Sequence, residues 1–105
     1  SVISTWIYNS INNLDFVAYD REISMNYCYV QDIVCEFLLF LSEKQSSIYL
    51  EPKIIYSTTL GKVVDMINEF KENINNNKFK ISNNEFKVKL FKTYTDYYKK
   101  LNEEQ

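Results

Sequence analysis

The chain has 105 residues, is 46% hydrophobic and 16% aromatic, and carries a formal net charge of −2. This length predicts one domain or a fragment of one, residues 1–105, with enough apolar side chains to form a core. The charge balance argues against a nucleic-acid surface, which shows clustered basic excess, and no apolar run reaches the roughly 18 residues of a membrane span. We therefore expect no nucleic-acid partner and no membrane partner. The chain opens in an amphipathic pattern instead of a signal peptide, which predicts a cytoplasmic location.

The first thirty residues change from a helical to an extended pattern. Apolar residues at helical spacing predict a helix over residues 1–13, which a pair of asparagines ends. Leu14–Tyr19 is predicted to be a short strand and residues 20–22 a polar turn. Met25–Val30 is predicted to be a second strand, rich in tyrosine.

The middle of the chain returns to a helical pattern. From Ile33 the apolar period is helical, and the run Phe37–Leu41 fits a buried helix face. Residues 44–47 are predicted to be a loop. Extended patterns follow at 48–50 and 53–57, on either side of a proline, as in an edge strand or two short strands with a break between them.

The C-terminal half predicts two further helices. Thr58-Thr59 precede apolar residues at helical spacing, which indicates a threonine-capped helix over residues 60–70. The asparagine-rich stretch 73–84 is predicted to be a loop, and a broad apolar face predicts a last helix over residues 85–101. The pattern as a whole is that of an α/β fold with about four helices and short strands.

Cysteine and histidine usage argues against a metal site. The chain has no histidine, and Cys28 and Cys35 lack the C-x-x-C spacing of zinc or redox sites. Asp15, Asp20 and Glu22 do not have the spacing of a metal-binding loop. We expect no bound metal, and two reduced cysteines in the core of a cytoplasmic protein.

Gly61 is the only glycine in the chain. A dinucleotide cradle of the type G-x-G-x-x-G needs several glycines, because the backbone must approach the pyrophosphate and turn tightly into a helix. We therefore expect no cofactor site in this chain.

Three motifs occur in a familiar order. A strand ends in Tyr29-Val30-Gln31-Asp32-Ile33-Val34, a helix begins with Thr58-Thr59-Leu60-Gly61-Lys62-Val63, and Thr93-Tyr94-Thr95-Asp96-Tyr97-Tyr98 lies near the C-terminus. This order resembles the C-terminal, substrate-binding part of extended short-chain dehydrogenase/reductases, the NAD-dependent epimerase/dehydratase family. Within that family it is most similar to capsular-polysaccharide enzymes that reduce or epimerise UDP-linked deoxyhexoses. The resemblance covers nearly the whole chain.

The resemblance implies a division of labour. This chain would be the lobe that covers a nucleotide sugar, and an absent Rossmann lobe would supply NAD or NADP and the catalytic tyrosine and lysine. The implied reaction is hydride transfer at a sugar carbon, which the chain alone should not catalyse.

The family's catalytic Tyr-x-x-x-Lys pair has one match in spacing, Tyr49 and Lys53. Pro52 lies between them in a segment with an extended pattern, so the two side chains would not share a helical face. We therefore reject this pair and expect no catalytic residue in the chain.

Three residues are candidate substrate-binding groups: Arg21, Tyr27 and Tyr29. The two tyrosines lie on the same side of their strand, where they either line a sugar pocket or pack across strands. Arg21 is either a pyrophosphate contact or a turn cation, and it is the nearest basic residue to Met25, which stands where many members of the resembled family carry a phosphate-binding arginine. Asp32 is interpreted as a helix-opening carboxylate in preference to a catalytic one.

Two groups of C-terminal residues have simpler explanations than ligand binding. The last tyrosines are interpreted as packing residues in preference to a ligand cage: Tyr94, Tyr97 and Tyr98. The lysines are interpreted as a solvated face in preference to a single-strand nucleic-acid site: Lys78, Lys80, Lys87, Lys89 and Lys92.

A second hypothesis is a small, stand-alone helical interaction domain without strands. The enzyme-lobe hypothesis predicts short strands at 14–19, 25–30 and 53–57. It also predicts an exposed apolar surface, involving Trp6 and the first helix, where the Rossmann lobe would dock. Such a surface would favour self-association, so a homodimer is a further expected partner.

Overall fold

The computed structural model describes residues 1–43, 53–80 and 82–103. These residues form four helices and a two-stranded antiparallel sheet, so the predicted α/β fold class is confirmed. The elements in chain order are α1 (Val2–Ile11), β1 (Ser24–Tyr27), α2 (Val30–Ser42), β2 (Tyr56–Thr59), α3 (Leu60–Asn75) and α4 (Glu85–Glu103).

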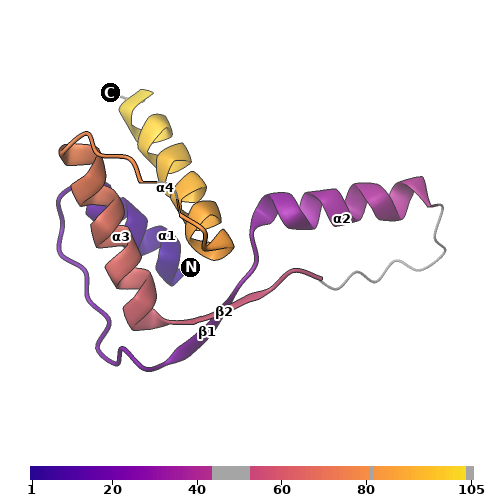
Figure 1. The fold of residues 1–105 in the computed structure, drawn as a ribbon, viewed down its shortest axis with the longest axis horizontal. Coiled ribbons are helices and arrows are strands. Elements are labelled where there is room, and N and C mark those ends of the chain that lie inside the picture. The colour runs from indigo at the N-terminus through magenta and orange to yellow at the C-terminus, as the bar shows by residue number, and fades with distance from the viewer. Residues whose placement is uncertain (44–52, 81, 104–105) are drawn as a thin grey trace.

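The core lies between α1, α3 and α4, which pack side by side in Figure 1. Each of these helices repeats apolar residues at helical spacing, so each has one stripe to bury. The side chains with almost no exposure come from all three helices: Ile7, Val63, Ile67, Leu90 and Tyr94. The three amphipathic helices predicted at these places are confirmed, although α3 runs further, to Asn75.

Local sequence signals set several helix ends. The Thr59 side chain accepts a hydrogen bond of 3.4 Å from the backbone N–H of Lys62, as the predicted threonine cap requires. Asn13 and Asn77 follow the ends of α1 and α3 with φ angles of 59° and 57°. Asparagine tolerates this left-handed conformation better than most residues, which explains why asparagine pairs end both helices.

The strands are shorter than predicted and shifted. β1 pairs with β2 in the register Ser24↔Thr59 to Tyr27↔Tyr56. The predicted strand at 25–30 therefore ends at Tyr27, because Tyr29 already acts as the residue before α2. The predicted strand at 53–57 is found at Tyr56–Thr59, because its last threonines pair with the start of β1 before they lead into α3.

The predicted strand at residues 14–19 is wrong. The burial pattern does alternate there, since Phe16 and Ala18 pack inward and Tyr19 is fully exposed. Phe16 lies on Trp6, with ring centroids 6.3 Å apart. Among the described residues no strand pairs with this segment, so it is an extended connection and not part of a sheet.

The helix α2 stands apart from the three-helix core, joined to it through β1 and β2 (Figure 1). The radius of gyration is 15.9 Å, whereas a compact domain of this size has about 13 Å. None of the residues in α2 is buried. The predicted buried face at Phe37–Leu41 is therefore wrong for the described part of the chain, because no other element covers it.

Several expectations concern residues outside the described ranges: the loop at 44–47, the extended segment 48–50 with Tyr49, and Pro52. The cysteines are both free, as expected, but Cys28 is half-buried and Cys35 is exposed. Their predicted place in the core is wrong, because Cys28 lies just after β1 and Cys35 lies on the uncovered α2. No helix in the described segments is both long and apolar enough to cross a membrane.

Candidate functional site

Two of the predicted binding residues lie together where β1 ends and α2 begins. The hydroxyl oxygens of Tyr27 and Thr93 are 3.0 Å apart, and the Thr93 hydroxyl donates to the carbonyl of Lys89 at 3.2 Å. Thr93 thus links the Tyr27 hydroxyl to the backbone of α4. The Lys89 ammonium nitrogen lies 5.7 Å from the centroid of the Tyr29 ring. We call this group, together with Asp32, the β1–α4 cluster.

Lys89 connects α4 to the first turn of α2. Its ammonium group donates a hydrogen bond of 2.5 Å to the carboxylate of Asp32. The two side chains are only 21% and 18% exposed, so the pair is partly withdrawn from water. The hydrogen bond to Asp32 is the main reason that the pKa of Lys89 is raised above its ordinary value of 10.5. Lys89 therefore stays protonated near neutral pH, and its charge is paired with the carboxylate of Asp32.

Aromatic rings form the wall behind this charge. Lys89 also lies 5.0 Å from the ring centroid of Tyr56, which pairs with Tyr27 across the sheet. Both tyrosine rings pack on Phe86, at centroid distances of 5.2 Å and 5.8 Å. Packing across the two strands thus explains the position of the Tyr27 ring, and the Tyr27 hydroxyl is hydrogen-bonded to Thr93.

Burial raises the pKa of the Tyr27 phenol above its ordinary value of 10.0, and the hydrogen bond with Thr93 partly opposes this shift. Tyr27 is therefore a neutral hydrogen-bonding group near neutral pH. Two hollows adjoin the cluster. One, of about 340 Å³, is lined by Tyr27, Cys28 and Thr93 among others, and the other, of about 250 Å³, by Tyr29, Glu85 and Lys89 among others.

The polar groups of this cluster can form hydrogen bonds with a ligand. Phenol and ammonium groups donate hydrogen bonds to hydroxyl and phosphate oxygens. Among the described residues, no three or more His, Cys, Asp or Glu side chains gather as they would around a metal ion.

Arg21 lies elsewhere, against α3. Its guanidinium donates hydrogen bonds to the carboxylate of Asp65 at 2.7 Å and to the carbonyl of Gly61 at 3.3 Å. The backbone N–H of Gly61 in turn donates to the carbonyl of Arg21 at 3.0 Å. Arg21 therefore fastens the turn before β1 to α3, and its pyrophosphate contact stays a prediction. Met25, at the arginine position of the resembled family, is half-buried against the core.

The side chain of Arg21 also lies directly against the Cα atom of Gly61. A Cβ atom on Gly61 would lie 2.8 Å from the Cβ of Arg21, so the missing side chain makes room for Arg21. The only glycine in the chain thus serves a close approach between two parts of the chain, and the absence of a cofactor site stays a prediction.

Sequence reasoning missed Lys89, Tyr56 and Thr93. Lys89 was expected on a solvated face, which is wrong because Asp32 and two tyrosine rings cover it. Lys89 and Thr93 are one helical turn apart and share a face of α4, which is the signal that could have linked them. Asp32 does lie in the first turn of α2, as predicted, and also pairs with Lys89.

The packing role of Tyr94 is confirmed. It is 1% exposed, and its hydroxyl lies 2.9 Å from that of the buried Ser10. Tyr97 and Tyr98 are 36% and 37% exposed, and the Tyr97 hydroxyl is 3.1 Å from that of Ser4.

The expected apolar docking surface at Trp6 is wrong, because Trp6 is 6% exposed and packs in the core. The exposed apolar surface lies on α2 instead. Its members, which we call the α2 surface, are Val30, Ile33, Val34, Phe37, Leu38, Leu39 and Leu41.

Comparison with solved structures places this arrangement among known folds. The chain matches the capsular polysaccharide assembling protein CapF from Staphylococcus aureus with a TM-score of 0.77 and 30% sequence identity, over 92% of this chain and 29% of that one. CapF with the inhibitor 3-isopropenyl-tropolone matches at a TM-score of 0.77 and 29% identity, over 92% of this chain and 29% of that one. A further CapF structure from Staphylococcus aureus gives a TM-score of 0.77 and 29% identity, over 92% of this chain and 27% of that one. No protein-family model and no curated protein sequence matches the chain.

The chain spans less than a third of the length of these CapF chains. Its strands exclude the strand-free helical domain that was the second hypothesis. The sequence resemblance to capsular-polysaccharide proteins is confirmed: the chain has the α/β fold of part of CapF.

Proposed function

We propose that the chain is the substrate-binding portion of a nucleotide-sugar epimerase or reductase of surface-polysaccharide biosynthesis. The similarity to CapF supports a role in polysaccharide biosynthesis. The observation that carries the finer proposal is the β1–α4 cluster. It brings Tyr27, Tyr29 and Lys89 together at the motif on which the family resemblance rests.

In this proposal the cluster binds and orients the nucleotide sugar. The Tyr27 and Tyr29 hydroxyls bond sugar hydroxyls, and Lys89 donates a further ammonium N–H to a phosphate oxygen beside its bond to Asp32. The chain performs no chemistry alone. NAD or NADP and the catalytic tyrosine and lysine would belong to a Rossmann lobe outside these residues, and the enzyme would work in the cytoplasm.

The α2 surface supports the existence of such a lobe. A helix that is apolar on most of its circumference is normally buried. No residue of α2 is buried here, the residues of the α2 surface are exposed, and the matched CapF chains are more than three times as long as this one. We propose that the Rossmann lobe packs on α2, and that without it the chain self-associates through the same helix.

The test is titration of the 105-residue chain with UDP and with a UDP-linked 6-deoxyhexose, followed by amide NMR. We expect saturable shifts at Tyr27, Tyr29 and Lys89, and no oxidation of added NADPH. Tyr27→Phe should weaken binding several-fold, because one hydrogen bond to the sugar is lost. The matched control is Tyr8→Phe, on the exposed side of α1, which should bind normally.

Two results would overturn the proposal. One is that neither ligand shifts any residue of the β1–α4 cluster at millimolar concentration. The other is that Tyr27→Phe and Tyr8→Phe bind equally well.

A further inference from the structure

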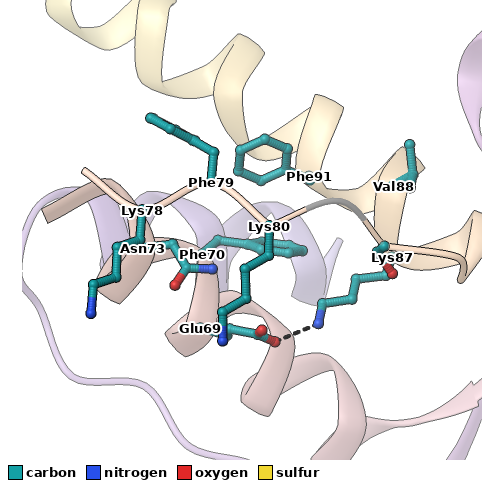
Figure 2. A pocket seen from close by; sticks show the side chains of 10 residues that line it. Glu69, Phe70, Asn73, Lys78, Phe79, Lys80, Lys87, Val88 and Phe91 are labelled. Carbon is teal, nitrogen blue, oxygen red and sulfur yellow. Dashed lines mark ion pairs between the residues drawn. The ribbon is translucent and has the colours of Figure 1, made fainter. Parts of the chain in front are cut away.

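One cavity, of about 380 Å³, lies between α3, α4 and the segment that joins them, but it does not form a ligand site of its own. Figure 2 shows the ring of Phe79 on one side of that segment and the side chains of Lys78 and Lys80 on the other. Lys87 is already paired with Glu69 at 2.6 Å. One small molecule therefore cannot contact both the ring and the lysines.

The middle of the connection between α1 and β1 has the side-chain pattern of a β-strand but no partner strand. From Asp15 to Tyr19 the exposure alternates. Phe16 and Ala18 pack inward, whereas Val17 and Tyr19 are 58% and 100% exposed. In Figure 1 this connection runs along the left margin of the molecule. Side chains of a strand alternate in this way when one face is packed and the other is open to solvent.

The backbone of this segment is unpaired. None of the N–H and C=O groups of residues 16–19 forms a hydrogen bond with another described residue. The connection is held at its two ends instead. Before the segment, the N–H of Leu14 donates to the carbonyl of Asn9 at 2.7 Å. After it, the carbonyl of Arg21 accepts from the N–H of Gly61 at 3.0 Å. The segment is therefore held extended before anything binds to it, which lowers the entropy cost of binding.

The sequence of this segment does not protect its edge. Natural proteins usually blunt an unpaired strand edge with lysine, proline or a bulge. Residues 14–19 contain no lysine, proline or glycine. Their outward side chains at Val17 and Tyr19 are of the β-branched and aromatic types that favour strands. Such a segment can accept an additional strand, whose main-chain hydrogen bonds then supply the affinity.

The surroundings of the segment are acidic. Asp15, Asp20 and Glu22 are exposed and form no ion pair with any described residue. Arg21 is the only basic residue between positions 12 and 23, and it is paired with Asp65 at 2.7 Å. A second copy of the same segment would bring like charges together, whereas a basic segment would meet opposite charges.

We propose that residues 15–19 are the docking site for an extended, basic segment of a partner protein, which adds to them as a β-strand. The backbone groups of the two segments pair. Apolar side chains of the incoming strand lie beside Phe16 and Ala18, and its lysines or arginines lie on the outer side near Asp15. The docking site shares no residue with the β1–α4 cluster, so its test is independent of the nucleotide-sugar proposal.

A basic peptide tests the proposal in the 105-residue chain. The peptide acetyl-Lys-Val-Lys-Val-Lys-amide should shift the amides of residues 15–19 in a saturable NMR titration. In the complex, amide exchange should slow at alternate positions only, either at Phe16 and Ala18 or at Val17 and Tyr19. The reason is that alternate N–H groups of a strand point to the same edge.

Two matched peptides separate backbone pairing from charge. The same peptide with every backbone nitrogen methylated keeps its charge and loses its N–H donors, so it should bind at least about tenfold more weakly. The counterpart in which glutamate replaces lysine keeps the N–H donors and should also bind at least about tenfold more weakly, because it meets like charges.

A pair of double variants tests the acidic surroundings. Asp15→Asn/Glu22→Gln should weaken binding of the lysine peptide about fivefold and flatten its dependence on salt. The matched control Glu72→Gln/Asp96→Asn removes the same charge from exposed positions on α3 and α4, and it should bind normally. All four positions are exposed, so both variants should keep the wild-type melting temperature.

Several results would overturn the proposal. They are an absence of shifts at residues 15–19 with millimolar lysine peptide, shifts confined to α2, undiminished binding of the methylated peptide, and equal affinities of the two double variants. A further one is slowed amide exchange at residues 16–19 that appears in the chain alone as its concentration rises, because the occupant would then be a second copy.

Discussion

The ammonium group of Lys89 in α4 and the carboxylate of Asp32 in α2 are joined by a hydrogen bond of 2.5 Å. The residues are far apart in the chain, and Asp32 belongs to the helix that stands apart from the core. Because no residue of α2 is buried, this polar bond is a main contact that sets where α2 starts. It also places a positive charge beside Tyr29 at the proposed binding site.

Lys89→Met should loosen α2 while the three-helix core stays folded. We expect faster amide exchange in α2 and a lower free energy of unfolding, because the ion pair with Asp32 is lost. The control is Lys92→Met, one turn away on α4, where no ion pair is present among the described residues. Equal amide exchange rates in α2 for the two variants would show that the Lys89–Asp32 bond does not hold α2 in place.

Gly61→Ala should destabilise the protein although alanine favours helices. The new methyl group would meet the Cβ of Arg21 at 2.8 Å, and such overpacking costs about 1–3 kcal/mol. Alanine contributes only about 1 kcal/mol through helix propensity. Chemical denaturation measures the balance. In an Arg21→Gly background, which removes the obstructing Cβ, the same substitution should become stabilising, and if it stays destabilising the contact is not the cause.

The same substitution should have different effects in the core and on α2. Leu90→Ala removes a fully buried side chain and should lower the free energy of unfolding by about 2–5 kcal/mol. Leu39→Ala, on the α2 surface, should change it by less than about 0.5 kcal/mol. Leu39→Ala should also reduce self-association in sedimentation velocity, whereas a core-like loss of stability at Leu39 would show that α2 is covered.

Stability should fall at alkaline pH, with Tyr94 as one cause. Burial raises the pKa of the Tyr94 phenol above its ordinary value of 10.0, and the bond with Ser10 partly opposes this. The folded chain therefore holds this proton more tightly than the unfolded chain. The stabilisation is complete below about pH 10 and is lost as pH rises through the folded pKa. Tyr27 and Lys89 shift in the same direction and add to the fall.

Urea unfolding between pH 8 and pH 11 measures this effect. Tyr94→Phe should lower stability at pH 8 by about 1–2 kcal/mol, because it leaves the buried Ser10 hydroxyl without its partner. Its further fall toward pH 11 should be smaller than that of the wild type. Tyr94→Phe/Ser10→Ala should recover part of the loss at pH 8. A pH slope identical to that of the wild type would show that Tyr94 does not contribute.

The helices and their ends followed from local chemistry, which explains why they could be predicted. Amphipathic spacing alone locates the buried stripes of α1, α3 and α4, since all the apolar residues of a stripe belong to one continuous stretch of sequence. The cap at Thr59 and the asparagine ends depend on neighbouring backbone groups only. The motif that carries the family resemblance is likewise local, because it depends on the order of residues within one segment.

The wrong predictions all concern segments whose structure depends on which other part of the chain packs against them. Residues 14–19 alternate like a strand, yet a strand exists only where another backbone pairs with it. An apolar face such as Phe37–Leu41 is buried only if something covers it, and nothing among the described residues does. Lys89 looks like any surface lysine in the sequence and becomes a site residue only because the fold brings Asp32 and two tyrosine rings to it.

The sequence by itself determined the fold class, the three core helices, the lack of a glycine-rich cofactor cradle and the resemblance to capsular-polysaccharide proteins. These depend on the order and spacing of residues along one chain segment. The tertiary structure alone decided the pairing of β1 with β2, the uncovered apolar surface of α2 and the Lys89–Asp32 bond. The physical reason is that these features arise from contacts between residues distant in sequence, whose partners no local pattern specifies.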